Sequence, residues 1–169
     1  MTESAVSIRR LTAADAPALR ALRLESLQAY PAAFATAYEE DEGRSAEDFA
    51  IMLEGGDDLA IFGAFVDGEL VGMAGFAREA RLKMRHKATL WGVYVKPARH
   101  GLKLGERLVQ AVIGHARGRV LLLQACVSTT NPSARRVYFG LGFKSWGVEE
   151  RALLVDGQWH ADDHIVLEL

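Results

Sequence analysis

The sequence is poor in cysteine, with only Cys126 among its 169 residues. A single cysteine cannot form an internal disulfide, and no cluster of cysteine and histidine has the spacing of a zinc site. We therefore expect neither a disulfide scaffold nor a bound metal. Cys126 lies in the apolar run VLLLQACV, which predicts a strand buried on both faces and a small buried thiol.

Long apolar runs and a large excess of charge are also missing. No apolar stretch is long enough to span a bilayer, and the opening MTESAVSIRRL lacks the apolar core of a signal peptide. These absences predict a cytoplasmic protein with no membrane partner. The net charge of −2 gives no general attraction for nucleic acid, so any anion-binding site has to be a local patch.

The composition itself is typical of one globular domain over residues 1–169, with 50% hydrophobic and 25% charged residues. No linker, repeat or low-complexity stretch divides the chain. Asp67-Gly68 and Asp156-Gly157 mark hairpin turns between strand-like runs. We expect an α/β (α+β) fold in which four helices flank a mixed sheet of about seven strands, over 6–11, 59–66, 69–77, 88–95, 120–127, 143–155 and 158–169.

Capping signals mark where three of the helices begin. Thr12 pairs with Asp15 as a capping box, and Ser45 opens the same pattern again. Asn131 followed by Pro132 is a common helix start, because proline fits the first helical position. In the first helix, leucines recur at helical spacing and should face the core; they are Leu19, Leu22 and Leu27.

The stretch KPARHGLKLGERLV, residues 96–109, combines glycines and positive charge at the start of another helix. The first amides of a helix lack intrahelical partners, and the helix dipole adds partial positive charge there. Gly101 and Gly105 let a large oxyanion approach the backbone. Nearby positive charge comes from Arg99, His100, Lys103 and Arg107. A diphosphate suits this loop, although glycines at such turns also serve tight packing alone.

The spacing of this loop excludes two common phosphate-binding motifs. No GK[ST] follows the glycines, so the loop is not a P-loop. The G-x-G-x-x-G spacing of a dinucleotide fingerprint is absent as well.

Two segments in order resemble the acetyl-CoA motifs of the GNAT superfamily of N-acetyltransferases. The first is LWGVYV with the loop KPARHGLKLG and the helix ERLVQAVIGHA, and the second is NPSARRVYFGLGF. The second carries the family's residues at Asn131, Ala134, Tyr138, Gly142 and Phe143. In the first, the family's pyrophosphate pattern Q/R-x-x-G-x-G/A falls on residues 100–105. There His100 replaces the first Gln/Arg, and Lys103 replaces the first glycine.

The resemblance implies that acetyl-CoA is the co-substrate and that its acetyl group passes directly to an amine. It assigns the coenzyme contacts to Val93, Tyr94, Val95, His100, Gly101, Leu102, Lys103, Leu104, Gly105, Glu106, Asn131 and Tyr138. Lys103 adds a charge to the diphosphate or crowds it through its Cβ, and the sequence leaves both open. Backbone N–H groups of residues 93–95, on a strand opened by a bulge, would polarise the thioester carbonyl.

Tyr138 matches the family's tyrosine that protonates the leaving thiolate. A phenol has a pKa of about 10 and is protonated at neutral pH, so it can donate. A core tyrosine on an apolar helix face is the alternative for this residue. Asn131 is expected to cap its helix, with a contact to the pantetheine arm as a further role.

The amine has to lose a proton before it attacks, because an alkylammonium has a pKa of about 10.4. Relatives often place a glutamate on the strand before the pyrophosphate loop, but Thr89 and Trp91 stand near those positions here. We assign no base and leave several substitutes open: Glu39, Glu40, His86 and His164.

The acceptor is expected along YPAAFATAYEED, residues 30–41, with Phe34 and Tyr38 as contacts and Trp91 as a further one. An ordinary amphipathic segment explains this stretch equally well. The sequence thus predicts acetyl transfer to the primary amine of a small molecule in a ternary complex. A protein N-terminus or lysine as acceptor, a non-catalytic acyl-CoA-binding module, and a homodimer formed through the terminal strands all remain open.

Overall fold

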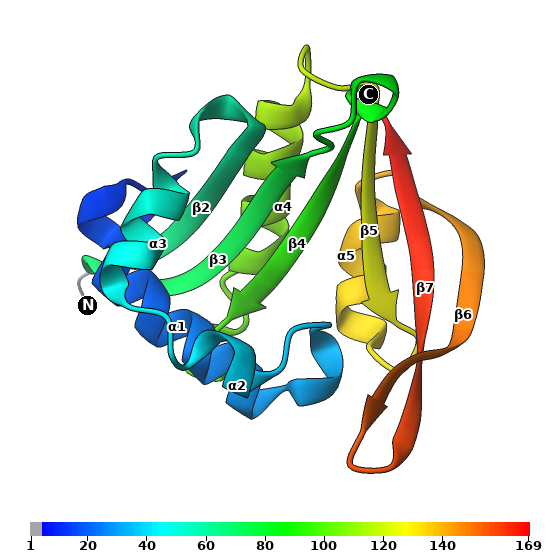
Figure 1. Ribbon diagram of the computed structural model, residues 1–169, viewed down its shortest axis with the longest axis horizontal. Coiled ribbons are helices and arrows are strands. Elements are labelled where there is room, and N and C mark those ends of the chain that lie inside the picture. Colours follow the sequence, from blue (N-terminus) through cyan, green and yellow to red (C-terminus); the bar gives the residue numbers. More distant parts are fainter. Residues whose placement is uncertain (1–4) are drawn as a thin grey trace.

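A mixed sheet of seven strands runs through the molecule, and the computed structural model describes it within residues 5–169 (Figure 1). Residues 1–4, part of the opening segment considered for a signal peptide, lie outside the described residues. The strands are β1 (Val6–Arg10), β2 (Leu59–Val66), β3 (Glu69–Arg78), β4 (Lys87–Val95), β5 (Leu122–Ser128), β6 (Lys144–Val155) and β7 (Gln158–Glu168). Their order is β1-β2-β3-β4-β5-β7-β6, so the predicted seven-stranded mixed sheet is confirmed.

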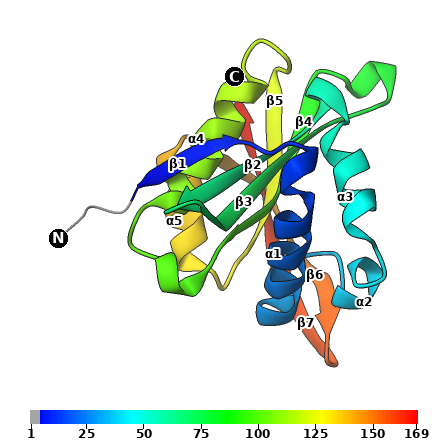
Figure 2. The same cartoon turned by 90° about the vertical axis from the view of Figure 1, so that its left-hand side faces the viewer.

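Helices cover the sheet on both faces (Figure 2). They are α1 (Ala16–Ala29), α2 (Tyr38–Asp41), α3 (Ala46–Leu53), α4 (Leu104–Ala116) and α5 (Pro132–Gly140). The short α2 was not predicted, whereas the other helices were. The caps are also as predicted: the Ser45 hydroxyl accepts a hydrogen bond from the Asp48 N–H at 3.2 Å, and the Asn131 side-chain Oδ1 accepts one from the Ala134 N–H at 3.1 Å.

The hydrophobic core forms two layers, one on each face of the sheet. On one face, α1 and α3 bury a cluster that includes Leu19, Leu22 and Phe49. On the other face, α4 and α5 bury a cluster that includes Leu108 and Leu123. The three leucines predicted to face inward from α1 are all buried, because their helical spacing places them on the side that meets the sheet.

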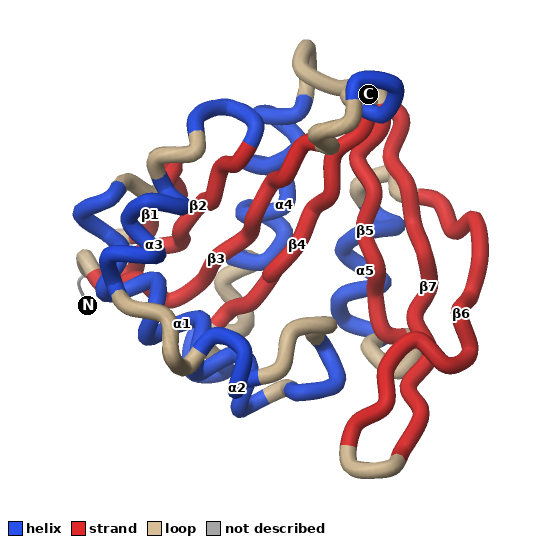
Figure 3. The backbone as a smooth tube through the Cα atoms, viewed as in Figure 1, coloured by secondary structure: helices blue, strands red, loops and turns tan. Residues whose placement is uncertain are grey.

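Strands β4 and β5 separate along their length, and this separation creates the site described below. They pair in parallel only where Lys87–Thr89 faces Leu122–Gln124. Beyond Thr89 the two strands diverge, as Figures 1 and 3 show. The backbone groups of β4 that face β5 past this point therefore have no strand partner.

Strand β5 corrects one prediction from the sequence. Its residues alternate, with Leu123, Ala125 and Val127 buried, while Cys126 between them is exposed. The expectation of a strand buried on both faces, and of a buried thiol, is therefore wrong. The physical reason is that α5 packs behind β5, whereas α1 and α3 lie over β2, β3 and β4 instead of over the opposite face of β5 (Figure 1).

Within residues 5–169, no helix is both long and apolar enough to cross a membrane.

Candidate active site

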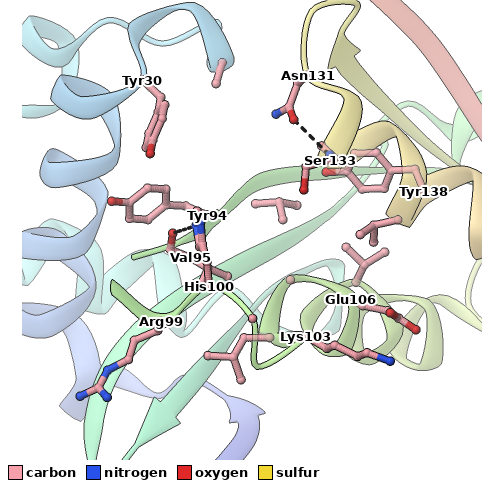
Figure 4. A pocket seen from close by; sticks show the side chains of 18 of the residues that line it. Tyr30, Tyr94, Val95, Arg99, His100, Lys103, Glu106, Asn131, Ser133 and Tyr138 are labelled. Atoms are coloured by element: carbon pink, nitrogen blue, oxygen red, sulfur yellow. Dashed lines mark hydrogen bonds between the residues drawn. The ribbon is translucent and has the colours of Figure 1, made fainter. Parts of the chain in front are cut away.

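A cavity of about 430 Å³ opens where β4 has left β5, beside the start of α4 and the inner face of α5 (Figure 4). Every predicted coenzyme contact lines this cavity except Leu102, whose side chain is exposed and stands outside the lining. Tyr30 and Ala33 of the predicted acceptor segment also line the cavity, whereas the sequence gave no role in binding to three further lining residues: Val109, Ser133 and Val137. Most of these are small or apolar residues, which carry no chemical signal of their own.

The loop before α4 presents unpaired backbone donors to the cavity. The first helical bond runs from the Arg107 N–H to the Lys103 carbonyl oxygen at 3.0 Å, so the N–H groups of residues 104–106 have no partner within the helix. Lys103 makes no side-chain cap and has a left-handed backbone, with φ of 54°. This end of α4 can therefore accept an anion.

The two glycines of the loop serve different purposes. Gly101 has φ of 93°, a backbone conformation that favours glycine. Gly105 has an ordinary helical position, and the nearest atom to a Cβ added there would be Val95 Cγ2 at 4.0 Å. Packing within the protein does not require a glycine at position 105. The space beside it is open to the cavity.

The positive side chains of the loop are divided in their roles. His100 places Nε2 3.0 Å from the Val95 carbonyl oxygen, which ties the loop back to β4 (Figure 4). Arg99 and Lys103 also line the cavity, whereas Arg107 is exposed and does not. The local charge expected from the sequence is thus supplied by fewer side chains than predicted.

A bulge interrupts β4 beside the cavity, as the family resemblance implied. Met73 on β3 pairs with Tyr94 and Gly75 pairs with Trp91, so two β4 residues, Gly92 and Val93, oppose one residue of β3. Gly92 has φ of 63°, which suits the bulge geometry. The bulge frees backbone groups next to a strand edge that is already unpaired.

Helix α5 contributes a phenol and an amide to the opposite wall. Tyr138 lines the cavity although its side chain is 7% exposed, and its ring packs edge-on against Phe143 at 5.7 Å. It is therefore both a core residue and a cavity residue. Burial raises the pKa of Tyr138 well above its ordinary value, so the phenol keeps its proton. The Asn131 oxygen caps α5, which leaves its NH₂ group free to face the cavity.

The predicted acceptor residues are spread over three hollows. Phe34 lines the 430 Å³ cavity and also a 650 Å³ hollow that Tyr38 and Glu39 share with residues 152–156. Trp91 lines a third hollow of 190 Å³ on the α1 side of β4. Phe34 and Tyr38 therefore share one hollow, whereas Trp91 lines a separate one, although Phe34 and Trp91 both lie beside Arg23.

None of the four residues left open as bases lines the 430 Å³ cavity, and two of them make hydrogen bonds elsewhere. Glu40 accepts a hydrogen bond from the Ala37 N–H at 2.7 Å, and His164 Nε2 lies 2.9 Å from Glu149 Oε2. Glu106 is the one carboxylate that lines the 430 Å³ cavity, and it stands at the start of α4. Within residues 5–169, no group of three or more His, Cys, Asp or Glu could hold a metal ion.

One polar contact near the cavity was missed by the sequence. The Tyr94 hydroxyl donates a hydrogen bond to Glu25 Oε1 at 2.9 Å. Burial, together with this carboxylate, raises the pKa of Tyr94 above its ordinary value. Glu25 lies on α1, far from β4 in the sequence, and nothing in its local pattern marks it.

Comparison with known proteins identifies the family. A model of the acetyltransferase (GNAT) family matches residues 19–143. The N-alpha-acetyltransferase RimI of Mycobacterium tuberculosis (strain ATCC 25618 / H37Rv) is 35% identical over 95 residues, which are 56% of this chain and 58% of that protein. The matched stretch is thus less than two thirds of that relative's length.

Solved structures agree in fold. An acetyltransferase of the GNAT family from Streptococcus pneumoniae superposes with a TM-score of 0.87 at 24% identity, covering 98% of this chain and 100% of that one. The putative acetyltransferase yncA from Salmonella typhimurium, solved with acetyl-CoA, gives 0.85 at 21% identity, covering 98% and 94%. These likenesses show the fold, and the family match extends over most of the chain. The chain belongs to the acetyltransferase (GNAT) family.

Proposed function

We propose that this protein transfers the acetyl group of acetyl-CoA to the primary amine of a small molecule. One observation carries the proposal: the unpaired N–H groups that begin α4, the free edge of β4 and the Tyr138 side chain all face one cavity. The diphosphate binds the N–H groups of residues 104–106. The pantetheine arm pairs with β4 as an added strand, in the gap left by β5.

The chemistry follows from these positions. The amine nitrogen attacks the thioester carbonyl carbon while both substrates are bound, and the C–S bond breaks. Backbone N–H groups at the β4 bulge stabilise the negative charge that develops on the carbonyl oxygen. Tyr138 gives its proton to the leaving thiolate and regains one from solvent. The products are an N-acetyl amide and free coenzyme A.

Removal of the amine's proton falls to water in this proposal. Glu106 is the one carboxylate in the lining of the cavity, and it stands in the first turn of α4 and not on β4. The Tyr94–Glu25 hydrogen bond provides a polar route from the cavity towards solvent, since the Glu25 side chain is 43% exposed. A water molecule that accepts the proton can pass it along this pair.

A second acceptor class is supported by one observation. The relative RimI is named an N-alpha-acetyltransferase, and the 650 Å³ hollow between residues 27–39 and 152–156 offers room for the end of a polypeptide.

The test measures turnover of acetyl-CoA with a panel of small primary amines and of peptides with free N-termini, using the release of the coenzyme A thiol as the signal. We expect faster turnover of small amines. Faster turnover of peptides would support the alternative, and coenzyme binding without any turnover would contradict both.

Two expectations from the sequence stay predictions. One is the cytoplasmic location. The other is a homodimer: β6 is an edge strand with exposed Trp146 and Val148, whereas β7 is enclosed between β5 and β6 and offers no edge.

A further inference from the structure

The 190 Å³ hollow lies on the α1 side of the β4 bulge. The other side of the bulge faces the 430 Å³ cavity, which we call the coenzyme cavity because the proposed function places the coenzyme there. Helices α1, α2 and α3 close the 190 Å³ hollow, and its polar lining consists of Arg23, Thr36, Asp41, Arg44 and Trp91. Gly92 of the bulge forms part of its wall. No local sequence pattern connects these residues, which come from α1, α2, β4 and the loops on either side of α2.

Two buried hydrogen-bond donors in this hollow have no partner. Arg23 is 6% exposed; its Nε donates to Asp41 Oδ2 at 3.0 Å, but its Nη1 makes no hydrogen bond. The indole Nε1 of Trp91 is also buried without a partner. Within the described chain these are the only buried side-chain nitrogen or oxygen atoms in that condition. Because unpaired buried donors are costly, their convergence on one hollow points to an acceptor group that binds there.

The position of Arg23 is fixed by its surroundings. Its guanidinium carbon lies 5.4 Å from the centre of the Phe34 ring and 5.7 Å from that of Trp91, so aromatic rings flank it. A Cβ on Gly92 would stand 3.7 Å from Nη1, and its absence leaves the space beside that atom open. The donor is therefore held in place with room next to it.

The charges of the hollow are unbalanced. Arg23 and Arg44 both bond Asp41, each at 3.0 Å, and Asp41 is the only carboxylate in the lining. Two positive groups thus share one negative group: the Arg23 side chain is buried, whereas the Arg44 side chain is 38% exposed, so solvent screens part of the surplus charge and the rest faces the hollow. Ordered water can satisfy the donors but cannot neutralise this charge, whereas a carboxylate does both. The volume equals that of roughly six water molecules, enough for a carboxylate and a few carbon atoms.

We infer that this hollow binds the carboxylate of the acceptor, so that the acceptor is an amino-acid-like molecule with a carboxylate a few bonds from its primary amine. The inference rests on the proposed function, because the bulge joins this hollow to the place where the amine meets the thioester. Phe34 connects the two spaces, since it lines the coenzyme cavity and contacts Arg23 on its other side. In a protein the α-carboxyl group of the first residue is part of a peptide bond, so an N-terminus other than Asp or Glu carries no such carboxylate. Peptides that begin with a neutral residue therefore separate the two acceptor classes.

The first test compares acids with their amides. Leucine, phenylalanine and glutamine are each assayed against the primary amide of the same amino acid, at matched concentrations of free amine. We expect the wild-type protein to prefer the acids by about tenfold or more in kcat/KM, because a neutral amide cannot form the charge-assisted hydrogen bond from Arg23 Nη1 that a carboxylate accepts. Arg23→Met should bring the acid-to-amide ratio towards one, with the change mainly in KM.

Arg20→Met is the matched control. Arg20 lies one turn earlier on α1 and bonds the carbonyl oxygens of Arg44 and Glu42 at 2.6 and 2.8 Å, but it does not line the hollow. This variant should keep the preference for acids. Equal turnover of acids and amides by the wild-type protein, or a preference that survives Arg23→Met, would overturn the inference.

The second test needs no turnover. With Trp146 and Trp159 replaced by Phe, Trp91 is the only tryptophan, and its fluorescence reports on the hollow. We expect a saturable change with N-acetyl-leucine and none with N-acetyl-leucinamide. The response should be absent in Arg23→Met, and if that variant does not fold, the wild-type titration alone decides. No saturation with the acid, or an equal response to both, would leave a hollow that holds water only and would overturn the inference.

The two tests also distinguish this inference from the proposed function. If no amine in the panel is acetylated while coenzyme A binds, the proposed function fails. The fluorescence titration still reports whether the hollow selects a carboxylate.

Discussion

The two sides of the β4 bulge are built from different kinds of donor. On the coenzyme side, backbone N–H groups of residues 104–106 face the cavity, and they come from one continuous loop and helix start. On the α1 side, the donors are the side chains of Arg23 and Trp91, which come from elements far apart in the sequence. A backbone site needs only a helix start and a glycine, whereas a side-chain site needs the finished fold to assemble it.

The two sides of the bulge also differ in how much their ligand-binding groups contribute to the stability of the fold. The unpaired N–H groups at the start of α4 hold nothing else in the protein together. On the α1 side, Asp41 bonds Arg23 of α1 and Arg44 beyond α2, so the same groups that line the hollow also join the helices that close it. We therefore expect substitutions on the α1 side to affect the fold, and those on the coenzyme side to affect mainly binding and rate.

The largest expected effect is on stability. Asp41→Asn leaves the buried Arg23 guanidinium without its charge partner, and the free energy of unfolding should fall by about 3 kcal/mol. Urea denaturation of the variant and the wild-type protein measures the change. The control on the coenzyme side is Glu106→Gln, which should cost less than about 1 kcal/mol because it removes only a favourable charge at the start of α4. Similar losses in both variants would contradict the proposed division of roles.

The next effect is on rate. Tyr138→Phe keeps the ring that packs against Phe143 but removes the hydroxyl, and kcat should fall about a hundredfold while the affinity for coenzyme A stays near that of the wild-type protein. Steady-state kinetics at saturating substrates and calorimetric titration with coenzyme A measure the two quantities. An unchanged kcat would remove Tyr138 from the chemistry and leave it as a core residue only.

Much of the fold could be predicted from the sequence, because its signals are local. Strand periodicity, hairpin turns and helix caps each involve residues that are close in the chain, and the seven strands and main helices follow from them. The exposed Cys126 could not be predicted, since an unbroken apolar run does not tell which face of its strand a helix will cover.

The same reasoning applies to the candidate site. The residues named from the sequence as coenzyme contacts all line one cavity except Leu102, because they belong to two compact motifs; their contact with the coenzyme stays a prediction. On the α1 side, Trp91 was named but Arg23 and Asp41 were not. Each looks like an ordinary charged residue of a surface helix, and only the fold reveals that they meet in a buried hollow.

The smallest expected effect is also the most direct test of the coenzyme side. Gly105→Val should weaken the binding of coenzyme A by about tenfold, because the added side chain enters the space of the diphosphate and blocks bonds to the N–H groups beside it. The protein itself has room for a Cβ there, so a loss of affinity reports on the ligand.

Gly114→Val is the matched control: it makes the same change in the same helix, at an exposed position with no atom within 4 Å of the added Cβ. Calorimetric titration with coenzyme A and with pantetheine, which lacks the diphosphate, completes the design. Gly105→Val should weaken only the former, and Gly114→Val neither. Equal affinity for coenzyme A in the wild-type protein and both variants would mean that the diphosphate binds elsewhere, and not at the N–H groups that begin α4.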